Sequence, residues 1–235
     1  MSHWTILCDF DGTIALDDVT DTLLVRFAQP GWERLESDWR AGRIGSRECM
    51  AGQVALLDMS PGEFDAHLRE RAIDPAFGEF VVQARARGVS LEVVSDGLDY
   101  SIQSILGREG LSDLSVTSNR LESAGDKAWQ LAFPHASALC RVGSGTCKCA
   151  RASEARRDRR RVLLIGDGAS DFCVAEAVDF VFAKGKLITH CIANAIPHVA
   201  ITGFAEALAL LPGLLEGSLG ERPETMPSLA SPTPA

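Results

Sequence analysis

The chain has 235 residues, 46% of them hydrophobic and 23% charged, which is the balance of an ordinary globular protein. The net charge of -9 argues against a nucleic-acid surface, because such a surface needs a basic patch that releases counterions. No apolar run approaches the ~18 residues of a membrane span, and the N-terminal residues lack the basic and apolar regions of a signal peptide.

The first predicted element is a buried strand at residues 4–8, a short β-rich apolar run. Residues 15–74 show no comparable strand, and their apolar residues recur at helical spacing. Within them, Ser60 followed by Pro61 and Glu63 predicts the start of a helix. We therefore expect residues 15–74 to form an inserted helical cap.

Strands and helices alternate in the rest of the chain. Apolar runs predict strands at residues 89–94, 114–117, 161–165, 180–182 and 199–201. Periodic segments predict helices at residues 75–87, 100–108, 170–178 and 205–211, and the irregular segment 119–150 has room for a short hairpin. This order predicts an α/β fold, a Rossmann-like doubly wound parallel sheet built from residues 1–14 and 75–217. The Pro/Ser-rich tail at 218–235 is expected to be disordered.

Three of the predicted strands end in small polar clusters. The clusters are Asp9-Phe10-Asp11, Ser95-Asp96-Gly97 and Gly166-Asp167-Gly168. In an open parallel α/β sheet the ligand site lies outside the carboxyl ends of the strands. The three clusters should therefore meet, although they are far apart in the sequence.

The residue types in these clusters suit phosphoryl transfer. Asp9 and Asp167 are hard oxygen ligands for Mg²⁺, with Asp171 one helical turn further on. A carboxylate can attack phosphorus to form an aspartyl-phosphate, and Asp11 could protonate the leaving oxygen and later activate water. Ser95 and nearby backbone N–H groups suit phosphate oxygens. Lys148 is the best candidate for the cation that the transition state needs, with Lys127 as a weak competitor.

Four segments, in order, resemble the motifs of the haloacid dehalogenase superfamily of phosphatases. The segments read DFDGT, VVSDG, CK and GDGASD. The resemblance implies Asp9 as nucleophile and Asp11 as general acid and base. It also implies Ser95, Asp96, Gly97 and Lys148 at the phosphate and Asp9, Asp11, Asp167 and Asp171 at an Mg²⁺ site. The helical insertion resembles the cap of the phosphoserine-phosphatase-like branch.

Within that branch, further segments resemble the subfamily of 2-hydroxy-3-keto-5-methylthiopentenyl-1-phosphate phosphatase. Two positions depart from that pattern, Asp96 in place of Gly and Cys149 in place of Pro. The expected function is thus hydrolysis of a small-metabolite phosphate ester, with methionine salvage as one setting. Phosphoserine and phosphocholine or phosphoethanolamine phosphatases share the same framework, and a catalytically idle phosphometabolite-binding protein is the alternative outside catalysis.

Several residues keep two readings at this point. Asp96 either caps the following helix or touches the ligand, and Asp171 could be a plain helix N-terminal acid. In the predicted cap, Asp18, Arg43 and Arg47 are candidates to face the substrate. The two arginines are included because an arginine side chain can bind the carboxylate of a phosphorylated acid through paired hydrogen bonds.

The seven cysteines are an odd number, which favours free thiols in a reducing compartment, and we expect a cytoplasmic protein. Cys140, Cys147 and Cys149 lie close in the sequence, but their spacing is poor for a structural zinc site. The sequence carries no signal for the oligomeric state.

Overall fold

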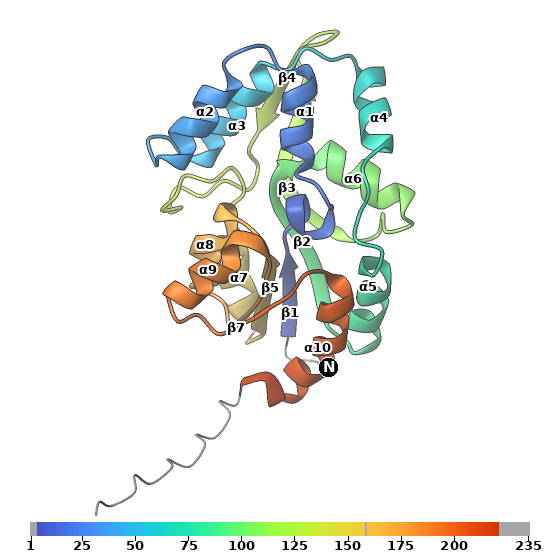
Figure 1. Cartoon of the computed structure of the whole chain (residues 1–235), viewed down its shortest axis with the longest axis vertical. Coiled ribbons are helices and arrows are strands. Elements are labelled where there is room, and N and C mark those ends of the chain that lie inside the picture. Colours follow the sequence, from blue (N-terminus) through green and yellow to red (C-terminus); the bar gives the residue numbers. More distant parts are fainter. Residues whose placement is uncertain (1–3, 158, 221–235) are drawn as a thin grey trace, which may run out of the picture.

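The centre of the computed structural model, which describes residues 4–157 and 159–220, is a seven-stranded sheet (Figure 1). The strands are β1 (Trp4–Cys8), β2 (Ser90–Leu98), β3 (Ser115–Ser123), β4 (Trp129–Ala132), β5 (Arg161–Gly166), β6 (Phe180–Ala183) and β7 (His198–Ala200). Their spatial order is β4-β3-β2-β1-β5-β6-β7, and only β4 runs antiparallel to its neighbour. The predicted α/β fold is confirmed.

Helices cover both faces of this sheet because the central strands are apolar on both sides. In β1, Ile6 and Cys8 pack into one core with residues of α5 (Phe77–Ala86), α6 (Asp99–Arg108) and α10 (Phe204–Glu216). Leu7 points the other way, into a second core with residues of α7 (Lys148–Arg157), α8 (Phe172–Ala175) and α9 (Gly185–Ala193). Alternate residues of a strand face opposite sides, so one strand supplies both cores.

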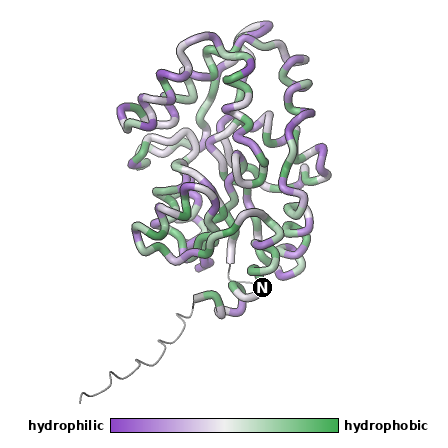
Figure 2. Tube along the Cα trace, viewed as in Figure 1, coloured by the Kyte–Doolittle hydropathy of each residue, from purple (hydrophilic) through white to green (hydrophobic). Residues whose placement is uncertain are grey.

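Four further helices lie above the carboxyl ends of the central strands: α1 (Val19–Phe27), α2 (Trp32–Arg40), α3 (Ser46–Ala55) and α4 (Pro61–Arg69). The helix start predicted at Ser60 is present as a capping box, in which Ser60 accepts from the Glu63 N–H and the Glu63 carboxylate accepts from Ser60. Helix α2 buries no residue, and its residues are largely hydrophilic, as the purple colour at the upper left of Figure 2 shows.

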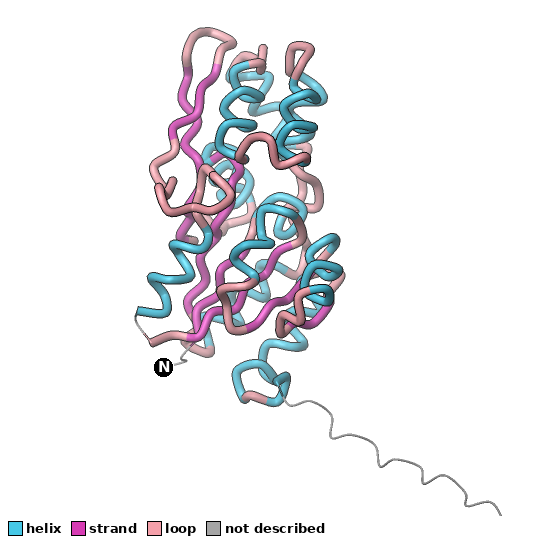
Figure 3. The backbone as a smooth tube through the Cα atoms, turned by 90° about the vertical axis from the view of Figure 1, so that its left-hand side faces the viewer, coloured by secondary structure: helices cyan, strands magenta, loops and turns pink. Residues whose placement is uncertain are grey.

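The irregular segment contains the expected hairpin, and the hairpin is longer than predicted. β3 and β4 extend beyond the other strands to the level of these four helices (Figure 3). At its tip, the Trp129 indole N–H donates to the Met59 carbonyl at 2.8 Å, and the Trp129 ring meets Phe64 edge-on. The hairpin is therefore packed against the helices as well as joined to the sheet.

Other boundaries shift by a few residues. α8 is a single turn that follows the 3₁₀ turn η2 (Ala169–Asp171), and α10 runs on to Glu216 with Pro212 inside it. Ser218–Gly220 is a short 3₁₀ turn, and the tail predicted at 218–235 lies outside the described residues from 221 onward. Among the helices of the described part, none has the length and apolar character needed to cross a bilayer.

Candidate active site

A cavity of about 420 Å³ lies between the carboxyl ends of the strands and helices α1–α3. Its floor is lined by Asp9, Asp11, Ser95, Asp96, Gly97, Asp167, Gly168, Ala169, Ser170, Gly185 and Lys186. The opposite side, which we call the helical wall, is formed by Asp18, Thr20, Asp21, Glu36, Trp39, Arg40, Ser46, Cys49, Met50 and Gln53. The three polar strand ends thus meet at one cavity.

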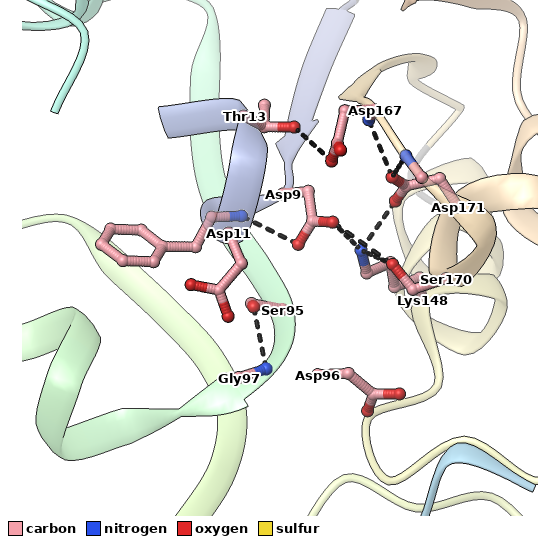
Figure 4. A network of polar contacts seen from close by, with 12 residues as sticks. Asp9, Asp11, Thr13, Ser95, Asp96, Gly97, Lys148, Asp167, Ser170 and Asp171 are labelled. Atoms are coloured by element: carbon pink, nitrogen blue, oxygen red, sulfur yellow. Dashed lines mark hydrogen bonds and ion pairs between the residues drawn. The ribbon is translucent and has the colours of Figure 1, made fainter. Parts of the chain in front are cut away.

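The floor contains a buried cluster of one lysine and two carboxylates. The Lys148 ammonium lies 2.8 Å from Asp9 Oδ2 and 2.6 Å from Asp171 Oδ1 (Figure 4). All three side chains are at most 6% exposed. Burial alone would lower the pKa of Lys148, but the charges of Asp171 and Asp9 outweigh it and raise that pKa above its ordinary value. The Lys148 ammonium, at the start of α7, is therefore held as a cation beside Asp9.

Asp171 is held in place from two sides. Its Oδ2 accepts from the backbone N–H groups of Asp167 at 3.1 Å and Gly168 at 3.3 Å, while Oδ1 accepts from Lys148. A side chain at Gly166 would place Cβ 2.4 Å from the Asp171 carboxylate, so this approach needs glycine there. The side chain thus does more than act as a helix N-terminal acid, because it also orients Lys148.

Asp167 faces Asp9 from the end of β5. Thr13 donates its hydroxyl to Asp167 Oδ1 at 3.1 Å (Figure 4), which joins the loop after β1 to the loop after β5. Gly12 stands between them with φ +68°, and a Cβ there would lie 2.7 Å from Asp167 Oδ2. Only a glycine adopts this backbone without strain and leaves room for the carboxylate.

The Asp11 side chain lies beside the carboxyl end of β2, near Gly97. Its carboxylate accepts from the Val19 N–H at 3.1 Å and the Thr20 hydroxyl at 3.2 Å. Burial, the charge of Asp18 and the charge of Asp9 raise the pKa of Asp11 well above its ordinary value. Asp11 can therefore hold a proton at a pH where an exposed aspartate has lost it, which is the property required of a general acid.

Ser95 and Gly97 lie beside Asp11 at an irregular stretch of β2. The pairing between β2 and β3 shifts register between Val94 and Leu98. The Ser95 hydroxyl accepts from the Gly97 N–H at 2.9 Å, and a Cβ on Gly97 would lie 2.8 Å from Asp11 Oδ2. The irregularity thus brings a hydroxyl and a bare backbone to the cavity, a surface that suits phosphate oxygens.

Asp96 makes contacts that its position in the motif did not predict. Its carboxylate accepts from the Ser46 hydroxyl at 2.5 Å and from the Thr146 N–H at 2.6 Å. Ser46 begins α3, and Thr146 precedes Lys148 by two residues. Asp96 therefore joins the floor of the cavity to the helical wall and to the segment that carries Lys148.

The three candidate residues from the predicted cap lie in different surroundings. Asp18 is the N-cap of α1 and lines the cavity, and burial and Asp21 raise its pKa to about 7. Arg43 pairs with Asp38 at 2.5 Å with 58% of its side chain exposed, outside the cavity lining. Arg47 also lies outside that lining, and its N–H donates to the Gly143 carbonyl at 3.1 Å. The structure thus brings Asp18 to the cavity but neither arginine.

The carboxylates of the floor could hold a metal ion. One oxygen each of Asp9, Asp167 and Asp171 lies within 4.8 Å of the others, and Lys148 is the one buried cation that they contact among the described residues. Three acidic side chains around a single cation leave a negative excess that a hard divalent ion would balance. The Asp11 side chain is not part of this group in the described chain.

Three contributors to the site escaped the sequence analysis. The Lys184 ammonium donates to the carbonyls of Gly12 at 3.0 Å and Thr13 at 3.1 Å, and the Ser170 hydroxyl donates to Asp9 Oδ2 at 3.3 Å. Lys184 follows β6 directly, so its place at the end of a fourth parallel strand was a usable signal. Thr13 and Ser170 adjoin motif aspartates, but their types do not distinguish a role from a turn.

Comparisons with known proteins agree with this geometry. The family model of the haloacid dehalogenase-like hydrolases matches residues 6–176. A 2-hydroxy-3-keto-5-methylthiopentenyl-1-phosphate phosphatase of Geobacillus kaustophilus is 32% identical over 210 residues, covering 88% of this chain and 94% of the relative. A protein of the same name from an Exiguobacterium species is 30% identical over 213 residues, covering 89% and 97%.

The fold has a solved counterpart as well. A phosphoserine phosphatase, determined as an analogue of its phospho-aspartyl intermediate, superposes with a TM-score of 0.66 at 19% identity. The match covers 87% of this chain and 97% of that structure.

Proposed function

The chain belongs to the haloacid dehalogenase-like hydrolases and is a phosphatase, and we propose that it is Mg²⁺-dependent and forms an aspartyl-phosphate on Asp9. The observation that carries the proposal is the buried arrangement of Asp9, Lys148 and Asp171 with Asp167 beside it, in which Asp9 and Asp167 line a cavity of about 420 Å³. Intact carboxylates at all of these positions disfavour an idle binding protein, which has no need of a nucleophile.

In the first step, Asp9 attacks phosphorus. Its Oδ1 accepts from the Phe10 N–H at 2.8 Å, which fixes the carboxylate at the end of β1. Asp11, whose raised pKa lets it hold a proton, donates that proton to the oxygen of the departing alcohol. Ser95 and Gly97 orient the phosphoryl oxygens, and the Lys148 ammonium stabilises their negative charge.

In the second step, water releases the phosphate from Asp9. Asp11, now deprotonated, accepts a proton from the attacking water, and the carboxylate of Asp9 is restored. Mg²⁺ held by Asp9, Asp167 and Asp171 would supply further positive charge to the phosphoryl group. In this proposal, residues 15–74 act as the cap that keeps bulk water from the cavity.

The helical wall supports an uncharged thioether leaving group best. Trp39, Met50 and Cys49 offer aromatic and sulfur surfaces, which suit an apolar thioether chain. Asp21 on the same wall disfavours a leaving group with its own carboxylate, such as that of phosphoserine, whereas the neighbouring Glu36 is already paired with Arg40 at 2.7 Å. We therefore propose 2-hydroxy-3-keto-5-methylthiopentenyl-1-phosphate, the substrate in the names of the two relatives, as the first candidate.

The same wall also supports a second candidate. Phosphocholine and phosphoethanolamine carry a cation that Asp21 and the Trp39 ring could bind. These esters differ from the first candidate in the charge of the leaving group, so a direct comparison of rates decides between the two.

The test is phosphate release from a panel of esters with and without Mg²⁺. The panel contains the methylthiopentenyl ester, phosphoserine, phosphocholine and phosphoethanolamine. We expect Mg²⁺-dependent turnover that Asp9→Asn abolishes, whereas the matched control Asp17→Asn, an exposed acid paired with Arg71, retains it. Absence of turnover by the folded, Mg²⁺-loaded protein on every ester would overturn the proposal.

A further inference from the structure

Two cysteine thiols outside the catalytic cluster lie in contact. Cys149 Sγ is 3.4 Å from Cys173 Sγ, and both residues are free and half-buried. Cys149 is the second residue of α7 and Cys173 the second of α8, two helices that lie side by side (Figure 1). The thiols therefore connect two segments that are 24 residues apart in the chain.

The same two segments carry part of the catalytic cluster. Lys148 immediately precedes Cys149, and Asp171 precedes Cys173 by two residues. The ion pair between Lys148 and Asp171, at 2.6 Å, thus joins the starts of α7 and α8 beside the thiol contact. Any change in the distance between these helix starts is transmitted to the lysine that contacts Asp9.

A metal site does not explain the thiols. Cys140 and Cys147 lie near the pair in space, because both interact electrostatically with Cys149, but no three cysteine sulfurs in residues 4–157 and 159–220 approach one another within 4.8 Å. A structural zinc ion needs four ligands around it. A pair of thiols at 3.4 Å instead has the arrangement that precedes a disulfide, whose sulfurs are about 2.05 Å apart.

We propose that Cys149 and Cys173 are a site of oxidative modification, in which a peroxide converts the two thiols to a disulfide that lowers phosphatase activity reversibly. One sulfur attacks the peroxide O–O bond, forms a sulfenic acid and releases water when the peroxide is hydrogen peroxide. The second thiol attacks the sulfenic sulfur, the S–S bond forms and a second water leaves. Two thiols and one hydrogen peroxide thus give one disulfide and two waters.

Disulfide formation acts on the site through Lys148. The two sulfurs must approach by roughly 1.4 Å, which pulls the starts of α7 and α8 together. The Lys148 ammonium has contacts of 2.6 Å and 2.8 Å on either side, and a charge-assisted hydrogen bond weakens steeply over a fraction of that movement. Displacing the ammonium from Asp9 removes positive charge from the phosphoryl group, and we expect a rate loss of about tenfold or more.

The experiment treats the full-length protein with hydrogen peroxide, then maps it with trypsin under non-reducing conditions. Trypsin separates the three clustered cysteines, because cleavage after Lys148 and Arg151 releases Cys149 on residues 149–151. We expect this peptide joined to residues 162–184, which contain Cys173, together with a loss of Mg²⁺-dependent phosphate release that a dithiol reductant reverses. Cys149→Ser and Cys173→Ser should each keep their activity in peroxide, whereas the control Cys140→Ser should remain sensitive.

The effect on rate rests on the proposed function, but the peptide map does not. Failure of the reduced protein to release phosphate would count against the proposed function, and the map would still decide whether the disulfide forms. Absence of the 149–151 to 162–184 cross-link would overturn the inference. So would a complete cross-link that leaves the rate unchanged.

Discussion

A pair of glycines with nearly the same positive φ allows the role of Asp167 to be isolated. Gly12 and Gly42 have φ of +68° and +69°. A Cβ at Gly12 would lie 2.7 Å from Asp167 Oδ2, whereas a Cβ at Gly42 would meet nothing within 4 Å. Alanine at either position carries the same left-handed strain, about 1–2 kcal/mol of unfolding free energy. Only Gly12→Ala also displaces a carboxylate of the site.

The displacement is large on the scale of metal coordination. Asp167 Oδ2 must move by about 0.7 Å to reach ordinary van der Waals contact with the new methyl group. Mg²⁺ requires near-ideal octahedral geometry, and ligand distances are tolerated within about 0.2 Å. We therefore expect Gly12→Ala to raise the Mg²⁺ concentration for half-maximal phosphate release by about tenfold or more.

The assay compares both variants in two measurements. Chemical denaturation should show the shared strain as a loss of unfolding free energy in both variants, with a further loss in Gly12→Ala from the displacement of Asp167, and Mg²⁺ titration of phosphate release should separate them. Equal Mg²⁺ requirements in the two variants would refute the reasoning, because the contact with Asp167 is the difference between them.

Three more predictions follow from the site and the helices above it. Lys148→Met leaves two buried carboxylates without their cation and should lower the unfolding free energy by about 3–5 kcal/mol in metal-free protein, with partial recovery on adding Mg²⁺ in the same denaturation assay. Ser46→Ala removes the hydrogen bond to Asp96 and should reduce kcat/KM about tenfold, whereas Ser46→Thr, which keeps the hydroxyl, should not; equal loss in both would contradict this reading. Burial, with Arg71 and Arg26, lowers the pKa of His67 below its ordinary 6.5, so the unfolded chain takes up the proton first and stability should fall as pH drops below about 6.5. Thermal melts from pH 7 to 5 should show this loss in the native protein and less of it in His67→Leu.

The meeting of the strand ends followed from the sequence because it depends on topology alone. Parallel strands place their carboxyl ends at one edge, so Asp9, Ser95 and Asp167 had to lie near one another once the strands were recognised. The four motifs also predicted the family correctly. The strands and the four motifs can each be recognised within a short segment of the chain, so both predictions needed local sequence only.

The contacts between segments did not follow from the sequence. The partners of Asp96 come from α3 and from the residues before α7, and no local pattern links these positions. Helix α2 buries no residue, so its periodicity does not reveal which side meets the cavity. Trp39 therefore could not be assigned to the cavity wall from the sequence, and Arg43, three residues beyond the end of α2, lies outside the cavity lining.

Because of the hairpin of β3 and β4, residues 15–74 cannot be exchanged between relatives as an independent unit. Trp129 is joined to Met59 by a hydrogen bond and to Phe64 by ring contact, so the tip of the hairpin belongs to the core of the helices above the cavity. A chimera that received residues 15–74 from a relative without residues 115–132 would lose both contacts and expose an indole. Recombination that preserves the fold must therefore move two separate stretches of the gene together, which couples their evolution although they are distant in the sequence.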